Sequence, residues 1–187
     1  RSRMGGIFAL PVLVVCFLAT SALGEVNPER WRWSNPLPHG NNVFDMLMTS
    51  ERTVQVGDRG AIYVQYGEGR RVPVASGVSE YLRGVTLMGE RLIVSGENGC
   101  LLWSDDGSIF QSAELSVSTS NWFEGVAASS QRAVAVGDNG TIYSSEDGES
   151  WVSASSGTTE WLRGVAFGDG IYVAVGENGE ILRSTNG

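Results

Sequence analysis

The sequence predicts an all-β fold, a β-propeller of about four four-stranded blades that forms an incomplete ring. Three observations predict it. A unit of about 40 residues recurs four times. Each unit holds short runs of β-branched and aromatic residues that end at Gly or Asn. Apart from an apolar run near the N-terminus, the chain lacks the amphipathic stretches that helical repeats of this period would need.

The repeat is defined by the pattern Val-x-Val-Gly-Asp/Glu-x-Gly. Its first glycine lies at Gly57, Gly96, Gly137 and Gly176, with spacings of 39, 41 and 39 residues. Positions twelve residues before and eight residues after each glycine keep the same register. The predicted units cover 41–80, 81–120, 121–160 and 161–187. The last unit is truncated, so we expect the chain to be a fragment.

Residues 1–24 have the layout of a secretory signal peptide. Arg1 and Arg3 precede an apolar run of about 12 residues, and small residues follow it. The run is shorter than the roughly 20 residues of a membrane-spanning helix, which favours cleavage. An uncleaved anchor and lipidation at Cys16 remain alternatives, and only an uncleaved signal would bring the chain to a membrane. We therefore expect a secreted, periplasmic or cell-surface protein.

Residues 25–40 form a lead-in segment that could supply a closing strand. Behind it, the third unit shows the expected blade most clearly: an A strand from Gly125, a B strand over 133–136, a C strand over 141–144 and a D strand from Trp151. Strands B and C lack polar alternation, as expected of strands buried on both faces between stacked blades. Asp138-Asn139-Gly140 supplies the residues that accept positive φ in a tight hairpin between them.

The turn between the C and D strands carries the most specific local motif. Its Ser and Asp side chains can bond to turn amides, its Gly accepts left-handed φ, and its aromatic can pack beneath the turn. We assign these residues a structural role: Ser104, Asp106, Gly107 and Phe110 in the second unit, and Ser145, Asp147, Gly148 and Trp151 in the third. The first unit has Gln65-Tyr66-Gly67-Glu68 here, so the motif predicts no such turn there.

At these residues the chain resembles the Asp-box, or bacterial-neuraminidase-repeat, propellers. Together with Trp161-Leu162-Arg163-Gly164-Val165 and the Val-Gly-Glu-Asn-Gly hairpin, it looks like the photosystem II stability/assembly factor-like branch. The resemblance covers about Trp31 to Gly187 and implies a propeller. It also implies a surface bearing arginines that binds a client protein, and Arg83 and Arg163 match the repeated Leu-Arg-Gly-Val positions.

The strand order places the B–C turns and the D–A loops on one face, which we call the top face. The candidate binding residues on it are Arg83, Arg163, Trp122, Trp161 and Glu124. The two tryptophans could instead be wedges between blades, since large aromatics dominate core packing. The nearby acids Asp58, Glu97, Asp138 and Glu177 could be solvated turn residues. Because Phe44 and Glu124 replace Arg in alternate units, a continuous cationic patch is not expected.

The residue inventory offers little for catalysis, and we predict no catalytic residue. The chain has a formal charge of −8, no Lys and one His, His39, which argues against nucleic-acid binding and against triad or His-based metal chemistry. Cys100 is expected to be a small strand residue rather than a nucleophile. The acids lie in separate blades, so we predict no metal and no cofactor.

The sequence therefore favours a non-enzymatic binding or assembly scaffold whose partner is a protein or an extracellular glycan. The alternative is a fragment of a secreted carbohydrate-active hydrolase, because two carboxylates suffice for glycoside hydrolysis. A structural domain of a larger cell-surface protein is a third interpretation.

Overall fold

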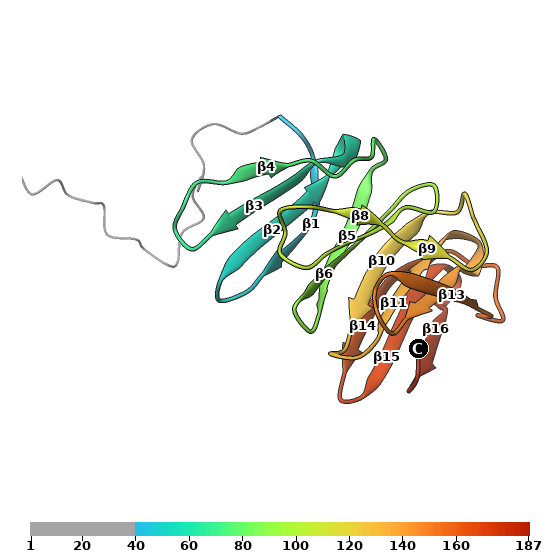
Figure 1. Cartoon of the computed structure of the whole chain (residues 1–187). Helices are drawn as coiled ribbons and strands as arrows, with labels where there is room; N and C mark the ends of the chain where they lie inside the picture. The colour runs from blue at the N-terminus through green and yellow to red at the C-terminus, as the bar shows by residue number, and fades with distance from the viewer. Residues whose placement is uncertain (1–39) are drawn as a thin grey trace, which may run out of the picture. The chain divides into compact units, whose positions relative to one another are not determined.

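The computed structural model describes residues 40–187 (Figure 1). The predicted signal peptide and lead-in segment lie outside the described residues. Within 40–187 the chain forms four sheets, which follow one another in chain order. Short 3-10 turns join some strands, and the described part contains no helix of the length and apolarity needed to span a membrane.

Each sheet is an antiparallel meander, as expected of a propeller blade, and we name its strands A to D from the inside outward. Blade 1 consists of β1 (Val43–Met48), β2 (Arg52–Gly57), β3 (Ile62–Tyr66) and β4 (Val72–Val74). Blade 2 consists of β5 (Leu82–Met88), β6 (Arg91–Gly96), β7 (Leu101–Ser104) and β8 (Gln111–Ser112). Blade 3 consists of β10 (Phe123–Ala128), β11 (Ala133–Gly137), β12 (Ile142–Ser145) and β13 (Ser150–Ala154). Blade 4 consists of β14 (Leu162–Gly168), β15 (Ile171–Gly176) and β16 (Ile181–Ser184).

Blade 3 carries a fifth strand that the repeat pattern does not predict. The two-residue strand β9 (Glu114–Leu115) leaves blade 2 and pairs in parallel with the outer edge of β13. The amide of Glu114 donates to the carbonyl of Glu149 over 2.7 Å, and that of Ser116 donates to the carbonyl of Trp151 over 2.8 Å. This pairing covers the exposed edge of blade 3 and ties it to blade 2.

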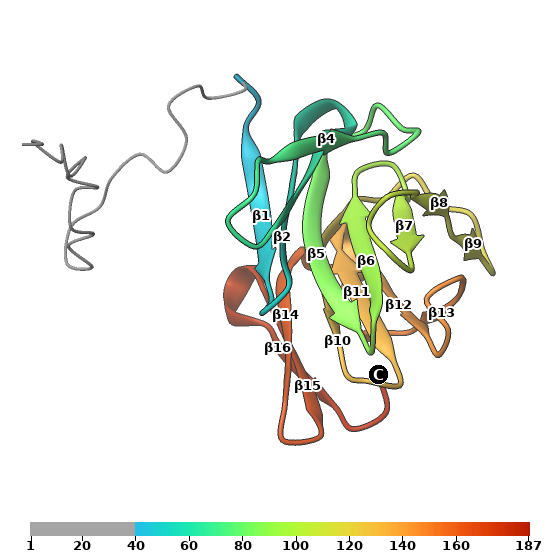
Figure 2. The ribbon, with the colours of Figure 1, turned by 60° about the vertical axis from the view of Figure 1, so that its left-hand side comes forward.

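The core lies between the blades. β5 packs between β1 and β10, and β10 packs between β5 and β14 (Figure 2). Each interface joins B- and C-strand residues of one blade to A-, B- and C-strand residues of the next. Between blades 3 and 4, for example, Val134 and Val136 pack with Leu162, Tyr172 and Ala174. The absence of polar alternation in the B and C strands follows from this two-sided burial.

The B–C turns of blades 1 to 3 are hydrogen-bonded to the loops that lead into the next blade. In blade 3, Asn139 and Gly140 have φ of 50° and 66°, which the predicted Asn-Gly pair supplies. The amide of Gly140 donates to the carbonyl of Glu160 over 2.9 Å. A Cβ on Gly140 would lie 2.0 Å from the carbonyl oxygen of Thr158, so no other residue fits. Gly60 and Gly99 donate in the same way, to the carbonyls of Glu80 and Asn121.

The C–D turn of blade 3 is closed by its own side chains. Ser145 Oγ accepts from the Gly148 amide over 2.7 Å, and Asp147 Oδ1 accepts from the amides of Glu149 and Ser150, each over 2.8 Å. Trp151 is buried beneath the turn, and its Nε1 donates to the carbonyl of Gly148. In blade 2, Ser104 Oγ accepts from the Gly107 amide, Asp106 Oδ1 accepts from the Ser108 amide, and Phe110 is buried.

An arginine at the start of a B strand donates a hydrogen bond to the C–D turn of the next blade. Arg52 donates to the carbonyl of Asp106 over 2.6 Å, and Arg91 donates to the carbonyl of Asp147 over 2.5 Å. Both arginines lie five residues before the first glycine of the repeat pattern, as Arg132 does in blade 3. In blade 1, β3 instead ends at Tyr66, whose hydroxyl also donates to the carbonyl of Asp106.

Candidate functional site

A bulge in every A strand produces the candidate site on the top face. The pairing of each A strand with its B strand skips one residue, at Phe44, Arg83, Glu124 and Arg163. A bulged residue leaves the ladder and its side chain is re-aimed. We call these four residues the bulge row. The residues two positions earlier include Tyr81, Trp122 and Trp161, which contribute the aromatic rings beside the row.

Arg83 is enclosed by aromatic rings from three blades. Its guanidinium carbon lies 4.7 Å from the ring centroid of Phe44, 5.5 Å from that of Trp122 and 5.9 Å from that of Tyr81. Its Nη2 donates to Glu97 Oε1 over 2.5 Å, and only 22% of its side chain is exposed. Arg83 is therefore a packed and neutralised cation rather than a free one.

Arg163 occupies the same repeat position but stays more accessible. Its guanidinium carbon lies 3.7 Å from the ring centroid of Trp161, and it pairs with Glu177 and, over 3.7 Å, with Glu124. Its side chain is 44% exposed. The rings of Trp161 and Trp122 lie 6.1 Å apart, so a stacked cation and two indoles form one end of the site.

The acids of the B–C turns fall into two kinds that alternate between blades. Glu97 and Glu177 pair with the arginine of their own blade, 14 residues earlier. Asp138 Oδ1 instead accepts from the backbone amide of Trp122 over 2.8 Å, and its equivalent in blade 1 is Asp58. The B–C turn acids and the arginines of the bulge row thus recur at an offset of 80 residues, as Asp58 and Asp138, Glu97 and Glu177, and Arg83 and Arg163. The aromatic and acidic residues of the bulge row do not recur in this way, because Phe44 in blade 1 corresponds to Glu124 in blade 3.

Three buried polar atoms on this face have no hydrogen-bond partner among residues 40–187: Trp161 Nε1, Arg83 Nε and Asp58 Oδ1. A buried polar group without a partner costs about 1–3 kcal/mol. The Trp161 ring lies beneath the guanidinium of the exposed Arg163, and its indole N–H has no acceptor among the described residues.

The five binding residues predicted from the sequence are brought together by these contacts, because Glu124 joins the row through Arg163. The face is mixed in sign: three arginines, Arg59, Arg83 and Arg163, lie among five acids of the row and the B–C turns. Charges of both signs at fixed positions give orientation and specificity more than affinity. Most of the enclosure of Arg83 has no signal in its own repeat, because two of the three rings, those of Phe44 and Trp122, come from neighbouring blades.

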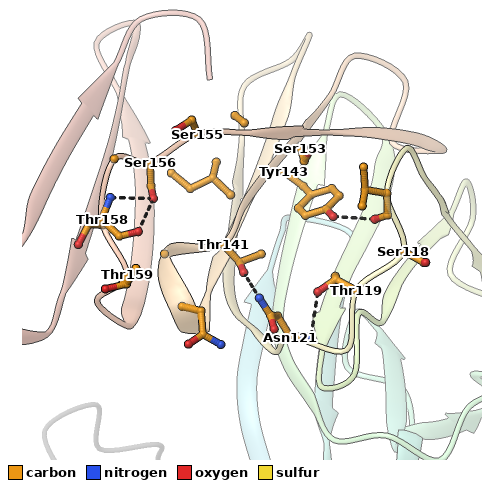
Figure 3. Close-up of a pocket in the computed structure, with 16 residues that line it drawn as sticks. Ser118, Thr119, Asn121, Thr141, Tyr143, Ser153, Ser155, Ser156, Thr158 and Thr159 are labelled. Carbon is orange, nitrogen blue, oxygen red and sulfur yellow. Dashed lines mark hydrogen bonds between the residues drawn. The ribbon is translucent and has the colours of Figure 1, made fainter.

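Apart from this row of residues, a hollow of about 680 Å³ lies by the outer strand of blade 3 (Figure 3). Its lining is rich in hydroxyls and contains no charged side chain. Much of this polarity is used internally: Tyr143 donates to the carbonyl of Val117 and Asn121 donates to Thr141 Oγ1, each over 2.6 Å. None of the predicted binding residues lines this hollow.

The described residues contain no group of three His, Cys, Asp or Glu side chains that could hold a metal ion. Burial raises the pKa of the Cys100 thiol to about 12, so that thiol is protonated at neutral pH. It is not an activated nucleophile.

Several solved structures are similar to this chain. YCF48 from Cyanidioschyzon merolae matches at 20% identity and a TM-score of 0.61, over 80% of this chain and 55% of that one. A structure described as YCF48 bound to D1 peptide matches at 18% identity and 0.61, over 75% of this chain and 48% of that one. The computationally designed Ika4 protein matches at 14% identity and 0.65, over 79% of this chain and 92% of that one.

The fold is that of a β-propeller. The chain spans about half the length of the YCF48 structures that it matches. At these identities the likeness concerns the fold. No protein-family model and no curated protein matches the sequence.

Proposed function

We propose that this chain is a non-enzymatic, exported propeller scaffold that binds an extended segment of a partner protein on its top face. The observation that carries the proposal is the end of the site at blade 4. There Arg163 is stacked on Trp161 and half exposed, and the Trp161 indole N–H is buried without an acceptor.

An extended peptide supplies what this arrangement lacks. Its backbone carbonyls can accept from the Trp161 indole N–H, and its side chains can pack on the two indoles. Interfaces concentrate their binding energy in aromatic and arginine anchors of this kind. The strands hold these anchors before the partner arrives, so little ordering entropy is lost on binding. That YCF48 has been seen with a D1 peptide supports a peptide as the class of ligand.

Export rests on the pattern of residues 1–24, with a charged start, a short apolar run and small residues. Loss of residues 1–24, which contain two of the 13 arginines and no acid, would leave 21 acids and 11 arginines. The exported chain would therefore present a negatively charged surface, on which the top-face arginines are local exceptions.

The test is a selection of peptides from a random displayed library on the purified chain. Affinities of the enriched peptides are then measured by fluorescence anisotropy. We expect Trp161→Ala and Arg163→Ala each to weaken binding by about tenfold or more. Arg70→Ala, which removes an exposed arginine away from the top face, should leave it unchanged. Enriched peptides that bind Trp161→Ala as well as the wild type would refute the proposal.

A further inference from the structure

The B–C turn of blade 3 carries a motif that peptide binding does not use. Asn139-Gly140-Thr141 has the form Asn-x-Ser/Thr, which is the acceptor for N-linked glycosylation in an exported protein. No other complete triplet of this form, with a residue other than Pro in the middle, occurs in the 187 residues. The asparagines at the same turn position in blades 2 and 4, Asn98 and Asn178, lack the Ser or Thr two residues later.

The turn leaves the side chain of Asn139 accessible. Asn139 is exposed, with φ of 50°, and its side-chain amide makes no hydrogen bond to another residue within 40–187. In the same turn of blade 4, by contrast, Nδ2 of Asn178 donates to Glu160 Oε2 over 2.7 Å. The Asn139 amide nitrogen is therefore free to carry a substituent, and a bulky polar group there extends from the surface.

The rest of the motif is engaged once the protein has folded, which places the modification before the turn closes. Thr141 Oγ1 accepts from Asn121 Nδ2 over 2.6 Å, and the Gly140 amide donates to the carbonyl of Glu160 over 2.9 Å. Glu160 lies later in the chain. During synthesis and export from the N-terminus, Asn139 therefore arrives before the residue that fixes its turn to the next blade, and the motif is still open.

The hollow by the outer strand of blade 3 gives an attached sugar room beside the turn (Figure 3). Asn139 is one of its lining residues, and no charged side chain lines it. The hydroxyls of Ser118 and Ser153 line it without a hydrogen bond to another described residue, so the neutral hydroxyls of a sugar can pair with them. None of the bulge-row residues lines this hollow, so a sugar in it leaves the peptide site open.

We propose that Asn139 is an acceptor site for N-linked glycosylation. Its Nδ2 forms a bond to the anomeric carbon of an oligosaccharide that is carried on a polyprenyl diphosphate. The bond between that carbon and the diphosphate oxygen breaks, the polyprenyl diphosphate leaves, and Nδ2 gives up one proton. The inference rests on the export that is part of the proposed function, and it does not depend on peptide binding.

The test is secretion of the full chain from cultured insect cells behind an established secretion signal. Mass spectrometry of the secreted protein should find an oligosaccharide on Asn139, and peptide N-glycosidase should remove it and leave aspartate at that position. Asn139→Gln and Thr141→Ala should each lose the oligosaccharide, whereas Thr141→Ser should keep it because serine preserves the motif. The matched control is Asn178→Gln, which alters the asparagine of an equivalent turn outside the motif and should keep the oligosaccharide. Circular dichroism verifies that each variant is folded.

A secreted wild-type chain with an unmodified Asn139 would overturn the proposal. So would an oligosaccharide that persists in Asn139→Gln, because another residue would then be the acceptor. The added signal separates this result from the export signal of residues 1–24, which is tested by secretion of the chain without the addition. A chain that carries the oligosaccharide but enriches no peptide would refute peptide binding and leave the acceptor site established.

Discussion

Arg83 and Arg163 show that contacts with neighbouring blades change the role of a residue that recurs at one repeat position. Both lie in a Leu-Arg-Gly-Val run and both pair with a glutamate of their own blade. Arg83 also lies between the rings of Phe44 and Trp122, whereas Arg163 stacks on Trp161 alone within the described residues. The first arginine is therefore mainly part of the packing, and the second is the one that a ligand can reach.

This difference predicts unequal stability losses. Arg83→Ala leaves the enclosed Glu97 carboxylate without its partner and uncovers three rings, so we expect the free energy of unfolding to fall by about 2–3 kcal/mol. Arg163→Ala removes a half-exposed ion pair and one stacking contact, so we expect the free energy of unfolding to fall by about 1 kcal/mol or less. Chemical denaturation of both variants checks the order. Equal losses would contradict the assignment of Arg83 to the packing.

At the scale of single elements, the C–D turns depend on aspartates that must be ionised. Amide hydrogen bonds, first that of Ser150 and then that of Glu149, lower the pKa of Asp147. Hydrogen bonds from Ser108, first its hydroxyl and then its amide, lower the pKa of Asp106. The ionised form of each carboxylate is the form that accepts these bonds.

The direction of these shifts fixes a pH dependence. A carboxylate with a pKa lower in the folded state than in the unfolded state stabilises the fold above the unfolded pKa, about 3.9 for Asp, and this contribution is lost as the pH falls through the folded pKa. We expect the melting temperature to fall between pH 5 and pH 2, and Asp147→Asn to be less stable than the wild type at pH 7 with a shallower decline. A decline of wild-type steepness in Asp147→Asn would show that this turn does not contribute.

At the scale of the whole molecule, stability depends on contacts between blades. Phe123 is fully buried in the cluster between blades 2 and 3, where its ring meets that of Tyr143 at 5.3 Å. Phe123→Ala should lower the free energy of unfolding by about 3–5 kcal/mol. Val152→Ala, at an exposed position on β13, should change it by less than about 0.5 kcal/mol. A loss below about 1 kcal/mol for Phe123→Ala, measured by denaturation, would contradict the central role of the interblade core.

The repeat register was enough to predict the propeller, its strand order and the positive φ of turns such as Asn139-Gly140, because each depends on local sequence. The strand β9 was not predicted, since two residues carry no periodic pattern and their partner lies in another blade. The contacts between residues of different blades could not be predicted from the sequence either. The Arg91 bond to the Asp147 carbonyl joins residues 56 positions apart, although arginine at the start of three B strands is a signal that was available.

The alternation of the top face constrains how such a chain can grow or shrink in evolution. Arg163 uses a carboxylate of the preceding blade, Glu124, and Arg83 uses the ring of Phe44 from its own preceding blade. Recombination that deleted the single blade between the two arginine-bearing blades would bring their guanidinium groups together without an intervening acid. Deletion or duplication of 80 residues would preserve the alternation of blades with arginine in the bulge row and blades with aspartate in the B–C turn, so the pair of blades, rather than the single blade, is the heritable unit of this alternation.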